Sequence, residues 1–153
     1  MSLDSIDKKL LEYLQKNSKQ TTKELSVKLN LSVTAVYERI KKLEREKIIK
    51  QHTVLLDKNK IGKGFTVFCH IKLKQHTKEN IIEFEKEITK LKEVLECFHV
   101  SGGYDYIIKV CVSDMNEFRE FMVTKLTVIK SIGSTQSSFS ISEVKNTTEL
   151  ILQ

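Results

Sequence analysis

The feature that most constrains this chain lies between residues 21 and 45, where two capped helical patterns follow each other with almost no linker. Thr21 precedes Glu24 by three residues, and the two can form a capping box in which each side chain satisfies the other residue's free backbone N–H. A second cap, Ser32, follows after a short break at residues 30–33. Because a further helix is expected over residues 4–16, the pattern predicts a helix-turn-helix.

The third predicted helix separates apolar residues from polar ones. At about 100° per residue, an apolar stripe lies on one face, and polar and basic side chains cluster on the other. The stripe consists of Val33, Val36, Ile40 and Leu43. Short side chains near a helix N-terminus allow close approach to base edges in the major groove, and later cations reach phosphates. A solvated amphipathic helix is the alternative, and the tight turn before the helix favours DNA binding over it.

Several residues of this helix and its cap are expected to contact double-stranded DNA. Those placed nearest the bases are Ser32, Thr34, Ala35 and Glu38. Those expected mainly at phosphates are Lys41, Lys42 and Arg45, so affinity should fall steeply with salt. Tyr37 and Arg39 are expected to brace the helix against the DNA backbone.

The charge of the chain is concentrated in this first part. The chain has 26 Lys and Arg against 20 Asp and Glu, a formal net charge of +6. Residues 1–60 carry 14 basic and 8 acidic residues, whereas residues 61–153 carry 12 of each. The basic part predicts contact with a polyanion, and the neutral part predicts a module with other partners. A strand-like stretch at residues 48–56 is expected as a wing or exit strand, and the polar stretch at residues 57–64 marks the domain boundary.

The second part predicts strands and helices in the order β-α-β-β-α-β. Alternation over residues 65–73 predicts a half-buried strand, and further strands are expected over residues 94–100, 106–112 and 134–145. Helical spacing predicts a helix around Phe84 and another opened by Asp114. This order predicts an α+β fold, the ferredoxin-like sandwich, with two helices on one face of the sheet. The other face is expected to pack against another copy of the chain and to carry Phe68, His70, Cys97 and His99.

Four stretches stand in order along nearly the whole chain. They are LDSIDKKLLEYLQKN and LSVTAVYERIKKLE in the first part, and VSGGYDYIIKV and IGSTQSSFSISEVK in the second. Together they resemble the Lrp/AsnC (feast/famine) family of transcription regulators. The resemblance implies a winged helix-turn-helix domain with a linker strand at residues 1–60. It also implies an AsnC-type (RAM) domain at residues 61–153 that dimerises and senses amino acids, in dimers, tetramers or octamers.

Two positions depart from the family pattern. The family often has Gly-Leu-Ser-Pro where this chain has Asn30, Leu31, Ser32 and Val33. It also often has glycine where Lys47 stands. Asparagine can adopt the left-handed conformation that a turn glycine supplies, so we expect the turn to survive. The departures are expected to alter the DNA sequence that is read and not the fold.

A loop with two adjacent glycines is the candidate effector site. Adjacent glycines allow positive φ and let a ligand approach backbone N–H and C=O groups. Asp105 suits a ligand ammonium, and Thr135 and Ser137, on one strand face, suit a carboxylate. The resemblance implies an amino-acid site of this kind between dimers. The candidate ligand-binding residues are Gly102, Gly103, Tyr104, Asp105, Thr135 and Ser137. The alternative is a hairpin turn in which the glycines and Asp105 serve backbone geometry.

Other classes of function find little support in the sequence. It contains no nucleophile elbow, P-loop or dinucleotide-binding motif, and its four histidines lack metal-ligand spacing, so we expect no enzyme, cofactor or metal. Two alternatives stay open: an enzyme like the sirohaem decarboxylases, which share this architecture, and a metabolite sensor that lacks DNA binding. Apolar runs are shorter than the roughly 20 residues of a membrane span, and no signal layout precedes them. We therefore expect a cytoplasmic protein without membrane contact.

Overall fold

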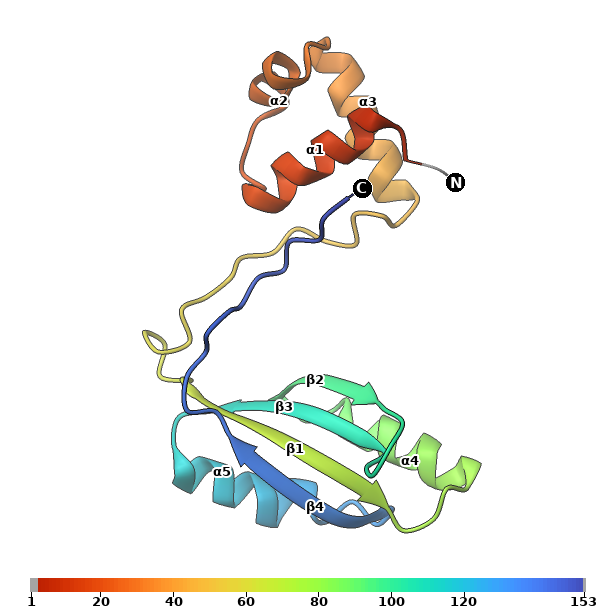
Figure 1. Ribbon diagram of the computed structural model, residues 1–153, viewed down its shortest axis with the longest axis vertical. Helices are drawn as coiled ribbons and strands as arrows, with labels where there is room; N and C mark the ends of the chain where they lie inside the picture. The colour runs from red at the N-terminus through yellow and green to blue at the C-terminus, as the bar shows by residue number, and fades with distance from the viewer. Residues whose placement is uncertain (1–2, 153) are drawn as a thin grey trace. The chain divides into compact units, whose positions relative to one another are not determined.

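Each helix of the first unit begins next to the residue expected to cap it. The computed structural model describes residues 3–152. Its first helices are α1 (Ser5–Lys16), α2 (Thr22–Leu29) and α3 (Val33–Arg45) (Figure 1). Capping boxes form at Asp4 and Thr21, and Oγ of Ser32 accepts the N–H of Ala35 at 3.1 Å. The predicted helix starts are confirmed because caps act within one turn of the chain.

The turn between α2 and α3 is made without glycine or proline. Asn30 adopts the expected left-handed conformation with φ 52°, and the N–H of Leu31 donates to the carbonyl of Ser26 at 3.0 Å. Lys47, just after α3, is also left-handed with φ 58°. A non-glycine residue in this region costs about 1 kcal/mol. At both positions that depart from the family pattern, a residue other than glycine thus adopts the left-handed backbone conformation.

The core of the first unit is small and aliphatic. Its fully buried side chains are Leu10, Leu25, Val36 and Leu43. Ile40 is half-buried against them. Val33 was expected in the same stripe but is 45% exposed, because it is the first residue of α3 and lies beside the turn. The apolar stripe of α3 therefore begins at Val36.

The strand expected at residues 48–56 is not formed. Residues 50–56 lie outside helices and strands, and the sheet of the described residues takes no strand from this segment. Val54, Leu55 and Leu56 are 69%, 74% and 62% exposed. A strand needs a neighbouring strand to pair its backbone N–H and C=O groups, so a strand-like composition does not suffice here.

The second unit is a four-stranded antiparallel sheet with two helices on one face (Figure 1). The strands are β1 (Phe65–Leu73), β2 (Val94–His99), β3 (Tyr106–Val112) and β4 (Ile132–Phe139), in the spatial order β2-β3-β1-β4. The helices are α4 (Lys78–Ile88) and α5 (Met115–Phe121), and α5 continues as a π-helix, η1 (Met122–Leu126). The ferredoxin-like sandwich is confirmed, although β4 ends before the expected residue 145. Within residues 3–152, no helix has the length and hydropathy needed to cross a membrane.

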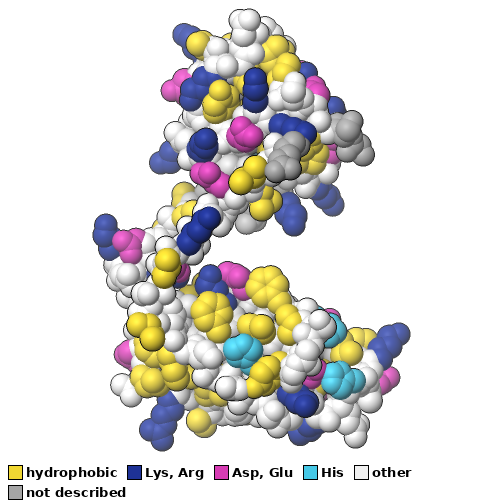
Figure 2. Space-filling model, in the orientation of Figure 1, with side chains coloured by type: hydrophobic (Ala, Val, Ile, Leu, Met, Phe, Trp, Pro, Cys, Tyr) yellow, Lys and Arg dark blue, Asp and Glu magenta, His cyan; other side chains and the backbone are white. Residues whose placement is uncertain are grey.

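Side chains of β1 alternate between the two faces of the sheet. Val67, Cys69 and Ile71 are fully buried on the helix-covered face. Phe68 and His70 alternate with them and lie on the open face, as expected. In Figure 2, hydrophobic side chains gather over the sheet of this unit.

A β-bulge changes which residues of β2 reach the open face. The register shifts between Val94 and Glu96, so Cys97 pairs with Ile108 and His99 pairs with Tyr106. Ile108 and Tyr106 belong to the core, and residues paired directly opposite each other share a face. Placing Cys97 and His99 on the open face was therefore wrong, because the bulge interrupts the alternation on which that prediction rested.

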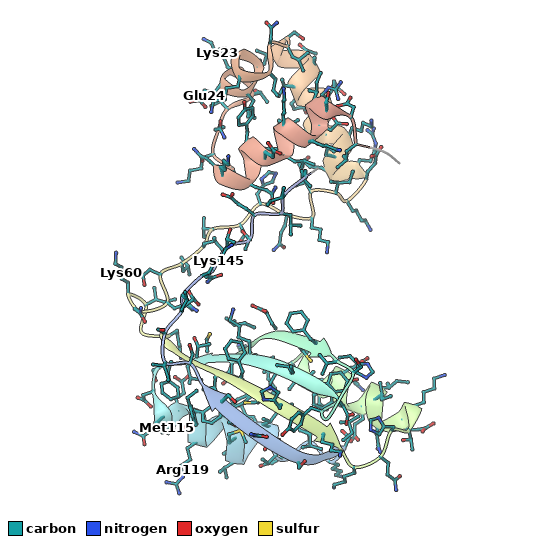
Figure 3. All side chains as sticks on the ribbon, viewed as in Figure 1. Lys23, Glu24, Lys60, Met115, Arg119 and Lys145 are labelled. Carbon is teal, nitrogen blue, oxygen red and sulfur yellow. The ribbon has the colours of Figure 1, made fainter. Side chains whose placement is uncertain are left out.

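The tail of the chain groups with the first unit. By its contacts, the chain divides into one unit that takes in residues up to Leu55 and from Val144 onward, and a second unit, Leu56–Glu143. The tail carries Lys145 (Figure 3). The sequence assigned this segment to the second domain, because it follows the last strand.

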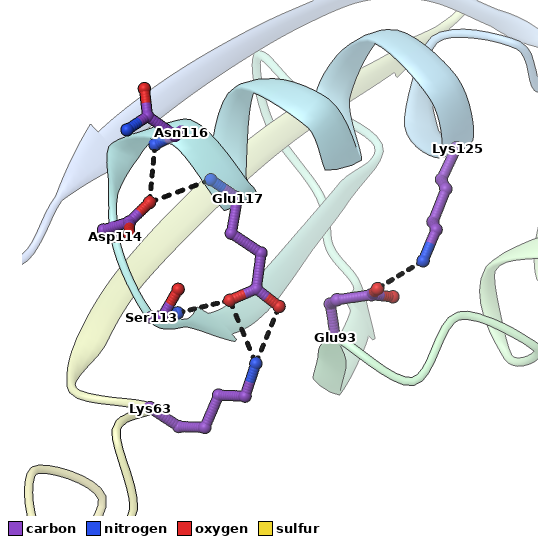
Figure 4. A network of polar contacts seen from close by, with 7 residues as sticks. All are labelled: Lys63, Glu93, Ser113, Asp114, Asn116, Glu117 and Lys125. Carbon is purple, nitrogen blue, oxygen red and sulfur yellow. Dashed lines mark hydrogen bonds and ion pairs between the residues drawn. The ribbon is translucent and has the colours of Figure 1, made fainter.

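A polar network organises the start of α5 (Figure 4). Oδ1 of Asp114 accepts the N–H groups of Asn116 and Glu117 at 2.8 and 3.0 Å. The carboxylate of Glu117 is 2.7 Å from Nζ of Lys63 and accepts the N–H of Ser113 at 2.6 Å. These contacts, that of Lys63 first, lower the pKa of Glu117 to about 2. The network confirms Asp114 as the cap and fastens the segment before β1 to α5.

Candidate nucleic-acid interface and effector loop

The outer face of α3 is exposed from its cap to its last residue. The exposed residues of the expected DNA-binding set are Ser32, Thr34, Tyr37, Glu38, Lys41 and Arg45. Ala35 and Lys42 are half-buried at its flank. Short polar side chains occupy the N-terminal half of this face and cations the C-terminal half. Such a face can place a helix N-terminus at base edges while its later turns lie at phosphates.

Lys41 is held by neighbours on its own side of the helix. Its Nζ lies 2.8 Å from Oε2 of Glu44 and 5.7 Å from the ring centroid of Tyr37. Oε1 of Glu44 lies 3.3 Å from Nε2 of His52. The hydrogen bond to Glu44 raises the pKa of Lys41, and the contacts of Lys41 and then His52 lower the pKa of Glu44. Because exposed ion pairs add little stability, Lys41 can exchange Glu44 for a phosphate.

Arg39 is engaged inside the first unit. Its Nη1 lies 2.7 Å from Oδ2 of Asp4 and 2.6 Å from Oδ1 of Asp7. The Asp7 side chain is 1% exposed, and the two carboxylates raise the pKa of Arg39 through these hydrogen bonds. Arg39 therefore fastens α3 to the first turn of α1. This contact differs from the expected brace against DNA. The sequence did not reveal the two partner carboxylates, because they lie at the start of another helix.

Asp105 organises the loop between β2 and β3. Gly102 has φ 126°, a conformation that favours glycine, as expected. Asp105 is 6% exposed, and its Oδ2 accepts the N–H of Leu73 at 2.7 Å. Its Oδ1 lies 3.2 Å from Nε2 of His76. Both carboxylate oxygens have partners within the chain, so a ligand ammonium at Asp105 requires the exposed His76 ring to move.

The two expected hydroxyl groups lie on the helix-covered face of β4. Thr135 pairs with Ile71 and Ser137 with Cys69, and both partners are fully buried. Oγ of Ser137 lies 3.6 Å from Sγ of Cys69. The hydroxyl residues share a face, as expected.

Tyr104 reaches the opposite face of the same strand. Its hydroxyl donates to Oε1 of Gln136, and its ring centroid is 5.1 Å from that of His70. The structure therefore joins Tyr104 to β4 through Gln136 and leaves Thr135 and Ser137 on the other side of the sheet. His70, His76 and Gln136 were missed as neighbours of the loop. Alternation places His70 and Gln136 on one face only once the strand register is known.

Two family models match the chain. The model described as the Lrp/AsnC ligand binding domain matches residues 66–150, and the model described as winged helix-turn-helix DNA-binding matches residues 3–50. The chain belongs to the Lrp/AsnC family. In this Lrp/AsnC protein, the DNA-binding match contains α1, α2 and α3. The ligand-binding match contains the sheet from Thr66 onward, together with the Asp105 loop.

Several transcription regulators are similar to this Lrp/AsnC protein over almost its full length. The DNA-binding transcriptional activator DecR of Escherichia coli is 35% identical over 99% of both chains. The leucine-responsive regulatory protein of Haemophilus influenzae is 36% identical over 99% of this chain and 92% of its own. Among solved structures, a transcriptional regulator of Neisseria meningitidis in complex with L-Met has a TM-score of 0.92 at 34% identity, covering 97% of this chain and 96% of its own.

Proposed function

We propose that this Lrp/AsnC protein regulates transcription in the cytoplasm by inserting the outer face of α3 into the major groove of double-stranded DNA. The observation that carries the proposal is the exposed face on which short polar residues precede cations. Thr34 and Glu38 lie nearest the base edges, and Lys41 and Arg45 reach phosphates. The names of the relatives support a regulator over a sirohaem decarboxylase or a sensor without DNA binding.

Residues 1–60 form the DNA-binding module in this proposal, and residues 61–153 serve sensing and assembly. The open face of the sheet supports self-association, because it exposes Phe68 (38%) and Phe98 (54%). A dimer built there presents two copies of α3, which read half-sites roughly 34 Å apart. Larger assemblies, such as tetramers or octamers, bury further surface.

The proposed effector is an amino acid bound at the second module. Support comes from the Neisseria meningitidis regulator, whose structure holds L-Met. The proposed contacts are Gly102, Gly103, Tyr104, Asp105, Thr135 and Ser137. The hydroxyl residues and Tyr104 lie on opposite faces of β4. One copy of the chain therefore contributes either the loop residues or the strand residues to a given site, and not both. Binding that changes DNA affinity amounts to a coupling free energy of typically about 1–3 kcal/mol.

The DNA proposal is tested with Lys41→Ala combined with Arg45→Ala. Genomic fragments selected by the parent protein are titrated at several salt concentrations. We expect the double variant to bind roughly tenfold or more weakly and to lose about two units from the slope of log affinity against log salt. Lys78→Ala combined with Lys86→Ala, which removes the same charge from exposed positions of α4, is the control. Equal binding by the parent and the recognition-helix variant contradicts the proposal.

The effector proposal is tested by adding a pool of amino acids to the parent protein. We expect a change in assembly, followed by sedimentation, or in DNA affinity. Thr135→Val with Ser137→Ala, and separately Tyr104→Phe, should weaken this response, whereas Ser138→Ala on the opposite face should not. A response that survives in both variants shows that the amino acid binds elsewhere.

A further inference from the structure

Leu150, near the end of the described residues, is bound by the first helix. The N–H of Leu150 donates to Oε1 of Gln15 at 2.7 Å, and Nε2 of Gln15 donates to the carbonyl of Leu150 at 3.0 Å. The side-chain amide thus pairs with both backbone groups of one residue, much as the backbone of a neighbouring strand does. Such a contact recognises an extended peptide whatever its side chain.

One apolar side chain of this segment packs against the first unit. Leu152 is half-buried and packs against the core of that unit, whereas its neighbour Ile151 is 89% exposed. Thr148, Leu150 and Leu152 line a cavity of about 570 Å³, whose other walls come from α1 and the segment after α3. The Leu150 side chain is itself 72% exposed, so Leu152 is the side chain of this segment that packs, and the backbone of Leu150 supplies the polar contact.

We propose that residues 148–152 form a C-terminal latch, which is the resident occupant of the groove between α1 and the segment after α3 of the same chain. Gln15 holds the backbone of the latch, and Leu152 anchors it in the apolar part of the groove. The latch fastens the chain that leaves β4 to the unit that carries α3.

The docked segment is joined covalently to β4. Residues 140–147 separate the end of β4 at Phe139 from the latch. Because the segment and the groove belong to one chain, docking is intramolecular and requires fewer contacts than the binding of a separate peptide. Because β4 carries Thr135 and Ser137, a change at β4 can reach the DNA-binding unit through the latch. This coupling rests on the proposed effector site, whereas the latch itself does not.

Amide hydrogen exchange in the full-length chain, resolved to single residues by NMR, tests the latch. We expect the Leu150 N–H to exchange roughly tenfold or more slowly than in an unstructured peptide. Gln15→Ala and, separately, Leu152→Ser should abolish this protection. Ile151→Ser alters the exposed neighbour and is the matched control, so it should leave the protection unchanged. The hydrogen bonds between Gln15 and Leu150 are exposed to solvent, so Gln15→Ala keeps the test valid if Leu152→Ser disturbs folding.

Three results overturn the latch: free exchange of Leu150 in the parent, protection that persists in Gln15→Ala, or an equal effect of Ile151→Ser and Leu152→Ser. Protection that disappears on dilution assigns the docked tail to a second copy and also overturns the proposal.

For the coupling, a pool of amino acids should change the exchange rate at Leu150 in the parent. If calorimetry detects binding but the rate stays constant, the coupling is wrong; if no amino acid binds, the proposed effector function is wrong instead.

Discussion

Each of the two units buries one aspartate, and the two aspartates have different neighbours. Within residues 3–152, Asp7 in the first unit and Asp105 in the second are the buried charged side chains, at 1% and 6% exposure. Asp7 faces the guanidinium of Arg39, whereas Asp105 accepts a backbone N–H and faces an exposed histidine ring. In the first unit, a buried carboxylate is paired with a charged guanidinium. In the second unit, the main partner of the buried carboxylate is a neutral backbone N–H. The same residue type thus positions α3 in one unit and closes a loop in the other.

The largest effect is expected from Asp7→Ala. Removing this carboxylate leaves Arg39 with the exposed Asp4 as its carboxylate partner and opens the capping box of α1, so we expect a loss of about 3 kcal/mol in the free energy of unfolding. Urea denaturation followed by circular dichroism measures it. Glu12→Ala removes a charge from the same helix at a half-exposed position and should change stability by less than about 0.5 kcal/mol. Equal stabilities of the two variants would show that the Asp7–Arg39 contact does not hold α3.

Asparagine variants separate the two kinds of burial. An amide oxygen can still accept the N–H of Leu73, so Asp105→Asn should cost less than about 1 kcal/mol, against about 2 kcal/mol for Asp105→Ala. Asp7→Asn should cost about 2 kcal/mol, because Arg39 loses a charge partner that an amide cannot replace. The same urea denaturation gives all these values. If Asp105→Asn is as costly as Asp7→Asn, charge matters equally at both sites and the contrast between the units is false.

The contrast also separates what the sequence could and could not predict. Asp4, Thr21, Ser32 and Asp114 act as caps within three residues of themselves, and all four were predicted from local spacing. The partner of Asp7 lies 32 residues away on α3, and the Leu73 N–H bound by Asp105 lies equally far along the chain. Spacing along the chain does not encode such pairings, so Arg39 was assigned to DNA.

The other features that the sequence did not predict are departures from regular alternation and contacts between distant segments. The bulge between Val94 and Glu96 moved Cys97 and His99 to the other face of the sheet, although the strand itself was predicted. The docking of Leu150 against Gln15 joins residues 135 positions apart. The sequence of a short apolar tail does not reveal which surface the tail contacts, because its partner residues lie far away along the chain. The exposed polar face of α3 was predictable because a single helix generates it.

The smallest effect is expected at Glu117, an ion-paired carboxylate of the second unit that is not buried. Lys63 and Ser113 lower its pKa from 4.5 to about 2, so folding favours its ionised form. This contribution is complete above about pH 4.5 and is lost as the pH falls towards 2. Glu117→Gln should therefore flatten the decline in stability over this range, measured by urea denaturation at a series of pH values. Glu120→Gln on the same helix should leave that slope unchanged. A parent and a Glu117→Gln variant with parallel pH profiles would show that this exposed network, unlike the two buried aspartates, does not contribute to the stability of the fold.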